Sequence, residues 1–202
     1  IKPGQPLPFE SDQTTHYSVV DQAGNMVAVT YTLNTNFGSG IVAAGTGILL
    51  NNEMDDFSAK PGVPNAYGLV GGAANAVAAG KRPLSSMTPT LVLKDQQPWL
   101  VTGSPGGARI ITTVLQQIVN GIDFGMNPAE AAAAVRFHHQ WMPDELRVEK
   151  GFSPDTLHLL RQKGQNVVVK PAMGRTQTIQ VQGQALWGYS DPRNPDGLTL
   201  GY

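Results

Sequence analysis

Apolar and polar residues alternate on both sides of a turn-forming segment near the beginning of the sequence. The stretch THYSVVDQAGNMVAVTYTLN places two β-branched, alternating runs around DQAGN, which predicts a β-hairpin. If Val20 pairs with Met26 across residues 21–25, Thr14 lies opposite Thr32. Alternation then gives the hairpin a polar and an apolar face. The polar face would hold Thr14, His16, Thr30, Thr32 and Asn34, and the apolar face Thr15, Tyr17, Val19, Val27, Val29, Tyr31 and Leu33.

The second half of the chain mixes helical periodicity with further short alternating runs. Helices are expected from about Ala108 to Ile122 and from Pro128 to about Phe137, the second with Asn127 as its N-cap. A third helix is expected in SPDTLHLLRQKG, capped by Ser153 or Asp155 and ended by Gly164. Strands are expected on both sides of KDQQ and in DELRVEKG, NVVVK, TQTIQVQG and ALWGYSDPR. This order predicts two sheets, or one mixed sheet, layered with helices.

A glycine- and proline-rich segment separates the hairpin from these elements. NFGSGIVAAGTGILLNNEMDDF ends in an acidic, amide-rich cluster, and SAKPGVPNAYGLVGG, residues 58–72, has no periodicity. Loops of this length within a compact domain are often functional, and the second stretch is interpreted as an ordered lid.

Composition fits one sizeable domain and narrows the possible partners. The 202 residues are 41% hydrophobic and 14% charged, with a formal net charge of −1, so no basic field favours nucleic acid or anionic lipid. No apolar run approaches the ~20 residues that span a bilayer. The sequence has no cysteine, which excludes disulfides, thiolate catalysis and Cys-ligated metals. It begins at Ile1 and is expected to be a fragment or a processed product.

Four short motifs carry candidate chemistry, each beside a purely structural interpretation. GSPGGAR matches neither a dinucleotide-binding nor a P-loop spacing; Gly106 and Gly107 form either a tight turn or an oxyanion hole at a helix start. FHHQW lacks the ligand spacing of a metal site, so no metal is expected. Ser85 and Ser86 suit a carboxylate or an ordinary turn. The acidic cluster suits a cation or ammonium group, or a solvated loop; it comprises Glu53, Asp55 and Asp56.

Taken together, these blocks resemble the small subunit of γ-glutamyltranspeptidase (glutathione hydrolase) from Thr14 to Tyr202. The matching blocks include TTHYSVVD, AVTYTLNTNFGSGI, GILLNNEMDDFSAKPG, KRPLSSMTPT, TGSPGGARIITTV, RFHHQWMPDELRVEKGFSPDTL and GYSDPR. The resemblance implies an α/β (α+β) fold, half of the αββα sandwich of N-terminal nucleophile hydrolases. It also implies a heterodimer with a large subunit cut from the same precursor, no cofactor, and a periplasmic or secreted bacterial enzyme.

The resemblance also implies a role for each candidate residue. Thr14 matches the nucleophile, exposed by self-cleavage after Gln13, so residues 1–13 would end the large subunit and residues 14–202 form the catalytic domain. Thr32 matches its hydrogen-bond partner, and Gly106 and Gly107 match the oxyanion hole. The expected substrate-binding residues are Thr30, Asn34, Glu53, Asp56, Ser85, Ser86 and the lid residue Tyr67.

The expected activity is attack of Thr14 on the γ-amide of glutathione or glutamine, then transfer of the γ-glutamyl group to water or to an amino-acid or peptide acceptor. Two alternatives remain. A related acylase would cleave glutaryl or cephalosporin side chains, and an inert assembly half would need the large subunit to act. Two positions depart from the family pattern: Glu53 stands where some bacterial relatives have Gln, and Val135 where relatives often have Pro.

Overall fold

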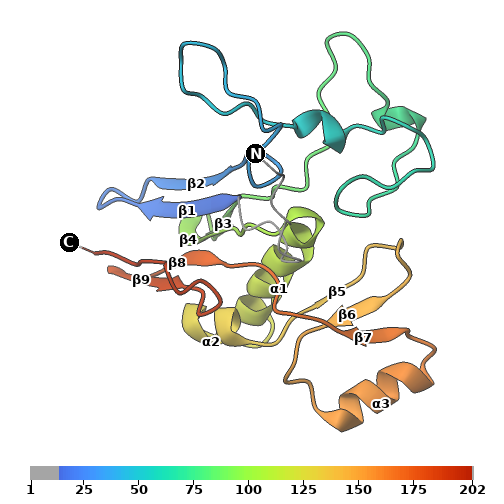
Figure 1. Ribbon diagram of the computed structural model, residues 1–202. Helices are drawn as coiled ribbons and strands as arrows, with labels where there is room; N and C mark the ends of the chain where they lie inside the picture. Colours follow the sequence, from blue (N-terminus) through green and yellow to red (C-terminus); the bar gives the residue numbers. More distant parts are fainter. Residues whose placement is uncertain (1–13, 202) are drawn as a thin grey trace.

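The computed structural model describes residues 14–201, which form an α+β structure with a long irregular segment near its beginning (Figure 1). Its strands are β1 Thr15–Val20, β2 Met26–Tyr31, β3 Thr90–Lys94, β4 Gln97–Thr102, β5 Phe137–His138, β6 Leu146–Val148, β7 Val167–Val169, β8 Gln177–Gln182 and β9 Ala185–Ser190. Its α-helices are α1 Ile110–Ile122, α2 Pro128–Ala133 and α3 Pro154–Gln162. Its 3₁₀ helices are η1 Glu53–Asp56, η2 Ala73–Asn75 and η3 Gly107–Arg109.

The β1–β2 hairpin has the predicted register. Val20 pairs with Met26 and Thr15 with Tyr31, so Thr14 and Thr32 face each other beyond the last pair. The polar face is the buried one: His16 is 6% exposed, and Ser18 Oγ donates to the carbonyl of Gln177 at 2.8 Å. The alternation therefore fixed the register, and the polar side chains point into the molecule.

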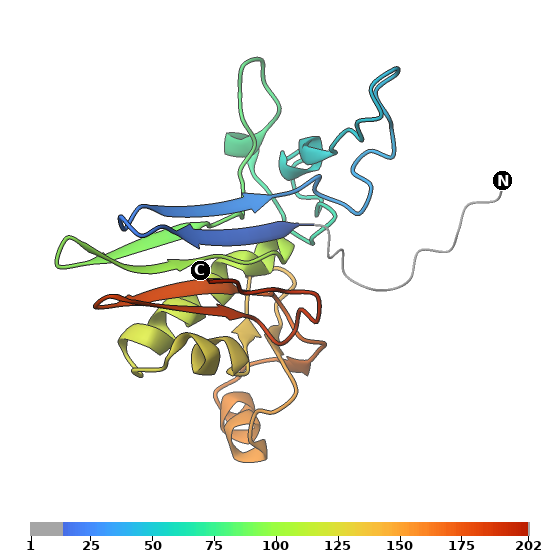
Figure 2. The same cartoon turned by 90° about the vertical axis from the view of Figure 1, so that its left-hand side faces the viewer.

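The described strands form three sheets. The hairpin is separate, β3-β4-β8-β9 is an antiparallel sheet, and β5-β6-β7 includes a parallel β6–β7 pair. The hairpin packs on β3, β4 and β8, while α2 packs on β8 and β9 and against α1. Figures 1 and 2 accordingly show the four-stranded sheet between the hairpin and α2.

The helix caps follow the sequence, but one helix is shorter than predicted. Asn127 caps α2 in a capping box with Glu130, and Ser153 rather than Asp155 caps α3. The first helix begins with the 3₁₀ turn η3 and continues as α1 to Ile122. The prediction that the second helix reaches Phe137 was wrong: α2 ends at Ala133, and the chain extends so that Arg136 enters a buried ionic network.

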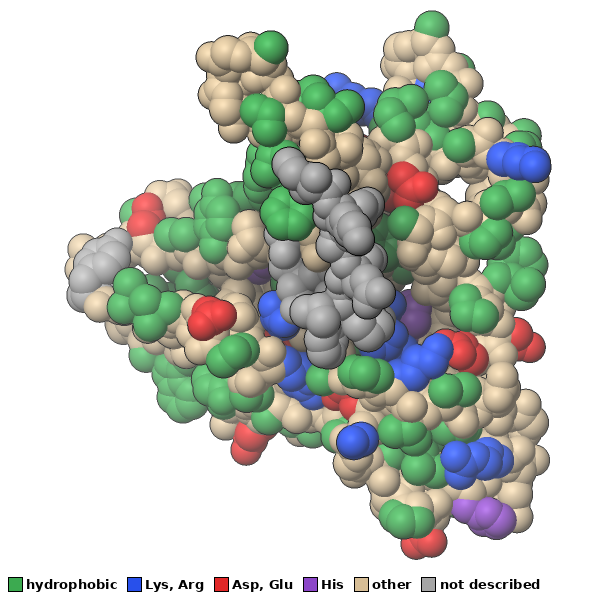
Figure 3. Space-filling view, in the orientation of Figure 1, with side chains coloured by type: hydrophobic (Ala, Val, Ile, Leu, Met, Phe, Trp, Pro, Cys, Tyr) green, Lys and Arg blue, Asp and Glu red, His purple; other side chains and the backbone are tan. Residues whose placement is uncertain are grey.

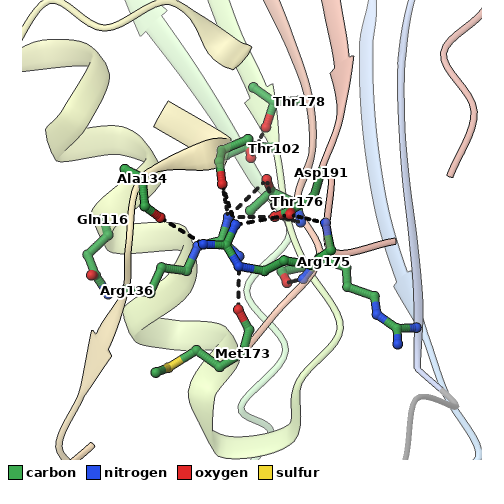
Figure 4. Close-up of polar contacts among 12 residues, drawn as sticks. Thr102, Gln116, Ala134, Arg136, Met173, Arg175, Thr176, Thr178 and Asp191 are labelled. Carbon is green, nitrogen blue, oxygen red and sulfur yellow. Dashed lines mark hydrogen bonds and ion pairs between the residues drawn. The ribbon is translucent and has the colours of Figure 1, made fainter. Parts of the chain in front are cut away.

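That network lies where the chain leaves α2, β6 and β9 and where it enters β8. Figure 4 shows the part around Arg136 and Asp191. Arg136 donates to Asp191 at 2.5 Å and to the carbonyl of Met173 at 2.9 Å. Glu149 accepts from Arg193 at 2.6 Å and from the backbone N–H of Met173 at 2.7 Å. Burial raises the pKa of Asp191 and the Arg136 guanidinium lowers it, with a net shift below the ordinary value, so Asp191 is ionised at neutral pH.

The outer face of the hairpin is apolar and open. Tyr17 is 51% exposed, Tyr31 64%, and Val19 and Val27 each 48%. Figure 3 shows hydrophobic side chains over the strands at the left of that view. No helix within residues 14–201 is long and apolar enough to span a bilayer.

The buried network predicts a large effect of Asp191→Ala. Removing the carboxylate leaves the buried Arg136 guanidinium without its counter-charge, which typically costs about 3–5 kcal/mol. We expect a fall of that size in the free energy of unfolding, measured by urea denaturation of the whole protein that carries this chain.

The matched control is Asp144→Ala. Asp144 also pairs with a basic side chain, His139, but its own side chain is 85% exposed, so we expect little change. Equal effects of the two substitutions would contradict the dependence of the fold on the buried network.

Candidate active site

Thr14 and Thr32 form a hydroxyl pair at the open end of the hairpin. Thr14 Oγ1 donates to Thr32 Oγ1 at 2.9 Å, and Thr32 Oγ1 also accepts from the backbone N–H of Asn34 at 2.9 Å. Thr14 is only 8% exposed, so its hydroxyl is positioned rather than freely rotating in solvent. The register of β1 and β2 alone produces this contact.

Asparagine side chains bring the acidic helix η1 beside this pair. Asn34 has a positive φ of 75°, which asparagine tolerates better than most residues, and its Nδ2 donates to the carbonyl of Asn52 at 3.2 Å. Asn52 Oδ1 in turn accepts from the backbone N–H of Thr35 at 3.1 Å. Because Asn52 directly precedes Glu53, these bonds fix the start of η1 next to the hairpin.

Glu53 and Asp56 form a pair of adjacent carboxyl groups. Residues three apart in a 3₁₀ helix eclipse one another, so both side chains point the same way. Burial, the nearby charge of Asp56 and a hydrogen bond to it raise the pKa of Glu53 to about 7, and burial raises that of Asp56. Glu53 Oε1 is buried and has no protein hydrogen-bond partner. Such a pair favours a cationic ligand.

Ser85 and Ser86 reach the same pocket through another asparagine. Asn75 Nδ2 donates to the carbonyl of Asp56 at 2.7 Å, and its Oδ1 accepts from the backbone N–H of Leu84 at 3.0 Å. One side chain therefore sets the distance between the acidic helix and the serine pair.

The glycine turn lies at the start of the helix that begins with η3. Gly106 and Gly107 have φ of 140° and 57°, conformations that residues with a side chain rarely adopt. A Cβ at Gly107 would lie 2.5 Å from the ring of Tyr67. Because the first N–H groups of a helix have no partner within it, this turn can offer amides to an anion.

The structure brings most of the predicted residues into one pocket. Thr14, Thr32, Asn34, Glu53, Asp56, Tyr67, Ser85, Ser86 and Gly107 line it together with Met87, Ala108 and Ile110.

Two predicted residues do not line this pocket. Gly106 precedes Gly107 in the same turn, and the Thr30 hydroxyl lies 2.8 Å from His16 Nδ1 on the buried hairpin face. Desolvation by burial lowers the pKa of His16 to about 4, so this ring is neutral and serves packing between the hairpin and Gly103.

Sequence reasoning did not single out the supporting amides Asn52 and Asn75. Their only signal was the amide-rich character of the segment, because their partners are backbone groups that no motif encodes. Among residues 14–201, no three His, Asp or Glu side chains converge as a metal site.

Comparisons with known proteins identify the family of this chain. A model of the family described as gamma-glutamyltranspeptidase matches residues 5–200. The chain is 71% identical over its whole length to the glutathione hydrolase proenzyme of Escherichia coli strain K12 and covers 35% of that relative. Against a mutant γ-glutamyltranspeptidase of Helicobacter pylori it has a TM-score of 0.87 and 58% identity, covering 89% of this chain and 100% of that one.

A cephalosporin acylase from Bacillus halodurans shares the fold at greater distance. Its TM-score is 0.76 with 31% identity, over 95% of this chain and 33% of that one. The likeness to γ-glutamyltranspeptidase structures confirms the predicted fold. The family match spans nearly all residues, and on this evidence the chain belongs to the γ-glutamyltranspeptidase family.

Proposed function

We propose that the protein containing this chain transfers γ-glutamyl groups from glutathione or glutamine to water or to the amine of an amino acid or peptide. The observation that carries the proposal is one pocket lined by a hydroxyl pair, Thr14 with Thr32, and a carboxyl pair, Glu53 with Asp56. The first supplies a nucleophile and the second a site for the α-ammonium group that distinguishes a γ-glutamyl group from other acyl groups.

Thr14 becomes an active nucleophile when the peptide bond before it is cut. A threonine hydroxyl needs a base, and a free α-amine with a reference pKa of about 7.7–8.0 on the same residue serves near neutral pH. While Gln13 is attached, that nitrogen is an amide and is not basic. Gln13 lies outside the described residues, and we propose that Thr14 Oγ1 itself attacks its carbonyl, forming an ester that water hydrolyses.

The same hydroxyl then performs turnover. Thr14 Oγ1 attacks the γ-carbonyl carbon, its proton passes through the α-amine to the leaving amine, and a γ-glutamyl ester remains on Thr14. The amides of Gly106 and Gly107 stabilise the oxyanion. Water or an acceptor amine attacks the ester and returns the proton to Thr14.

The head group of the substrate is held at both of its charges. Glu53 and Asp56, with Asn34, bind the α-ammonium through charge-assisted hydrogen bonds, and Ser85 and Ser86 bind the α-carboxylate. Tyr67 covers the pocket from the lid, residues 58–72. Thr30, hydrogen-bonded to His16, supports this arrangement from the hairpin.

The exposed apolar face of the β1–β2 hairpin is evidence that another polypeptide binds there. We propose that it is covered by a large subunit cut from the same precursor, of which residues 1–13 are the end and residues 14–202 the catalytic remainder. Exposed apolar patches of this kind commonly mark protein interfaces. The resemblance of residues 58–72 to the lid of bacterial family members supports a periplasmic or secreted location.

The hydroxyl pair predicts the outcome of Thr32→Val. Valine keeps the shape and β-branching but removes the acceptor of the Thr14 proton. We expect slower self-cleavage on a denaturing gel and a kcat lower by roughly 10²–10⁴-fold, the range for a positioned proton-transfer partner, with KM changed far less. Thr14→Ala, as reference, should remain uncut. Normal cutting and near-parent kcat in folded Thr32→Val would contradict the role of Thr32.

The carboxyl pair predicts selectivity for the ammonium group. Asp56→Ala should lose about 2–5 kcal/mol in kcat/KM for a γ-glutamyl anilide, the usual effect of truncating one member of a buried charge pair. The parent should turn over the glutaryl anilide, which has no ammonium, far more slowly. Equal turnover of the two anilides by the parent would favour the acylase activity instead.

The shared proton predicts pH-dependent binding of glutamate. At pH 7 the free pair is about half protonated, because the pKa of Glu53 is about 7, and an ammonium ligand would displace that proton. Affinity should therefore be about half its plateau value at pH 7 and fall more steeply at lower pH, approaching tenfold per pH unit about one unit below the pKa. The competitive inhibition constant of L-glutamate measures this.

Glu53→Gln is the control for that titration. Glutamine preserves the shape and an accepting oxygen but has no proton to release. Its inhibition constant should be nearly flat from pH 7 to 5.5; an unchanged pH dependence in this variant would assign the titration to another group.

A further inference from the structure

The side chain of Tyr67 is held by two groups of the proposed substrate pocket, Asn34 and Gly107. Its Oη donates to the carbonyl of Asn34 at 2.5 Å, and its ring lies so close to Gly107 that any side chain there would overlap it. The tyrosine therefore bridges the ammonium side of the pocket and the glycine turn. Its position decides how closed the pocket is.

The backbone of Tyr67 is held from the opposite direction by Gln140. Gln140 Nε2 donates to the carbonyl of Tyr67 at 3.2 Å and to that of Met142 at 3.0 Å. Gln140 follows β5, far along the chain from the lid, and also lies against Gly68, where an added Cβ would be 3.6 Å from Nε2. The Gln140 side chain, part of the FHHQW motif, thus contacts the lid at the residue whose side chain extends into the pocket.

A hydrogen bond from His138 orients Gln140, and a second one, from Thr112, orients His138. Because Gln140 Nε2 faces two carbonyl oxygens, its Oε1 faces His138 Nε2, at 2.8 Å, and that nitrogen must carry a proton. His138 Nδ1 then accepts from the hydroxyl of Thr112, at 2.7 Å, a shorter distance than the 3.2 Å to the other acceptor of that hydroxyl, the carbonyl of Arg109. Burial lowers the pKa of His138, so the neutral tautomer described here is the one present at neutral pH.

Thr112 lies in the first turn of α1, directly after the glycine turn. The hydrogen bonds from Thr112 to His138, from His138 to Gln140 and from Gln140 to the lid therefore connect the lid to α1, the helix whose beginning would offer the oxyanion amides. The lid and the glycine turn, on two sides of the pocket, are therefore both attached to α1.

We propose that Gln140 is a positioning residue for Tyr67, with His138 and Thr112 fixing its side chain. This inference rests on the proposed function: Gln140 holds the tyrosine over Gly107 and thereby sets the affinity for the γ-glutamyl donor. Gln140 touches no reacting atom, so its contribution appears in substrate binding rather than in the chemical step.

The test compares Gln140→Ala with Gln116→Ala in the whole processed protein. Gln116 is a stringent control: its Nε2 also donates to two carbonyls, those of Thr112 and Phe137, and its Oε1 accepts from the N–H of Phe137, so it supports the same neighbourhood without a hydrogen bond to the lid. We expect Gln140→Ala to raise the donor KM about 3- to 10-fold, the equivalent of one net hydrogen bond, with kcat nearly unchanged. Gln116→Ala should leave KM at the parent value.

A double substitution separates positioning from general stability. In a Tyr67→Ala background, Gln140→Ala should cause no further rise in KM, because the side chain it positions is gone. An equal rise in both backgrounds would overturn the proposal. Gln140→Glu keeps the acceptor for His138 but removes the donors to the lid, and should reproduce the KM of Gln140→Ala.

A readout independent of activity separates this proposal from the proposed function. Chymotrypsin cleaves after tyrosine, and cleavage after Tyr67 should be faster in Gln140→Ala and Gln140→Glu than in the parent or Gln116→Ala. A parent without γ-glutamyl activity would refute the proposed function, while this cleavage pattern would still test whether Gln140 positions Tyr67. Parent-like KM and cleavage in both Gln140 variants, or failure of both to process, would overturn the positioning role of Gln140.

Discussion

The buried pairing of Arg136 and Glu149 with Asp191 and Arg193 is the constraint on which the remaining structure depends. Its carboxylates and guanidinium groups hold residues 173–176 by their backbone. That segment in turn holds the glycine turn: the N–H of Arg175 donates to Ser104 Oγ at 2.8 Å, and Gly174 lies against Gly106. A buried ionic network thereby sets the backbone that would bind the oxyanion. Since such networks contribute little net stability against apolar packing, its value here is geometric.

Neutral amide side chains hold the pocket together, whereas its acidic side keeps one oxygen without a hydrogen-bond partner. Asn34, Asn52 and Asn75 satisfy backbone groups of three loop segments, which gives an irregular region fixed positions without secondary structure. In contrast, the carboxyl groups of Glu53 and Asp56 crowd each other and leave an oxygen unpartnered. An ammonium group between these carboxyl groups would offset their mutual repulsion, which is the physical basis of the proposed selectivity.

Local patterns predicted the elements that local physics decides. The hairpin register followed from strict alternation around residues 21–25, and the cap Asn127 followed from its side-chain chemistry, while Ser153 was one of two candidate caps. The end of α2 did not follow, because Arg136 leaves the helix to meet Asp191, a partner distant in sequence. The grouping of Glu53 with Ser85 came from the family resemblance alone, since the asparagine bonds that create it join side chains to backbone and leave no periodic signal.

Thr14 is the residue proposed to carry the acyl group during turnover. Peptide mapping by mass spectrometry, on active protein quenched during turnover of a γ-glutamyl anilide, tests that role directly. We expect one γ-glutamyl ester, on a peptide whose first residue is Thr14. An acyl group on any other residue, or turnover by protein in which Thr14 is still joined to Gln13, would contradict it.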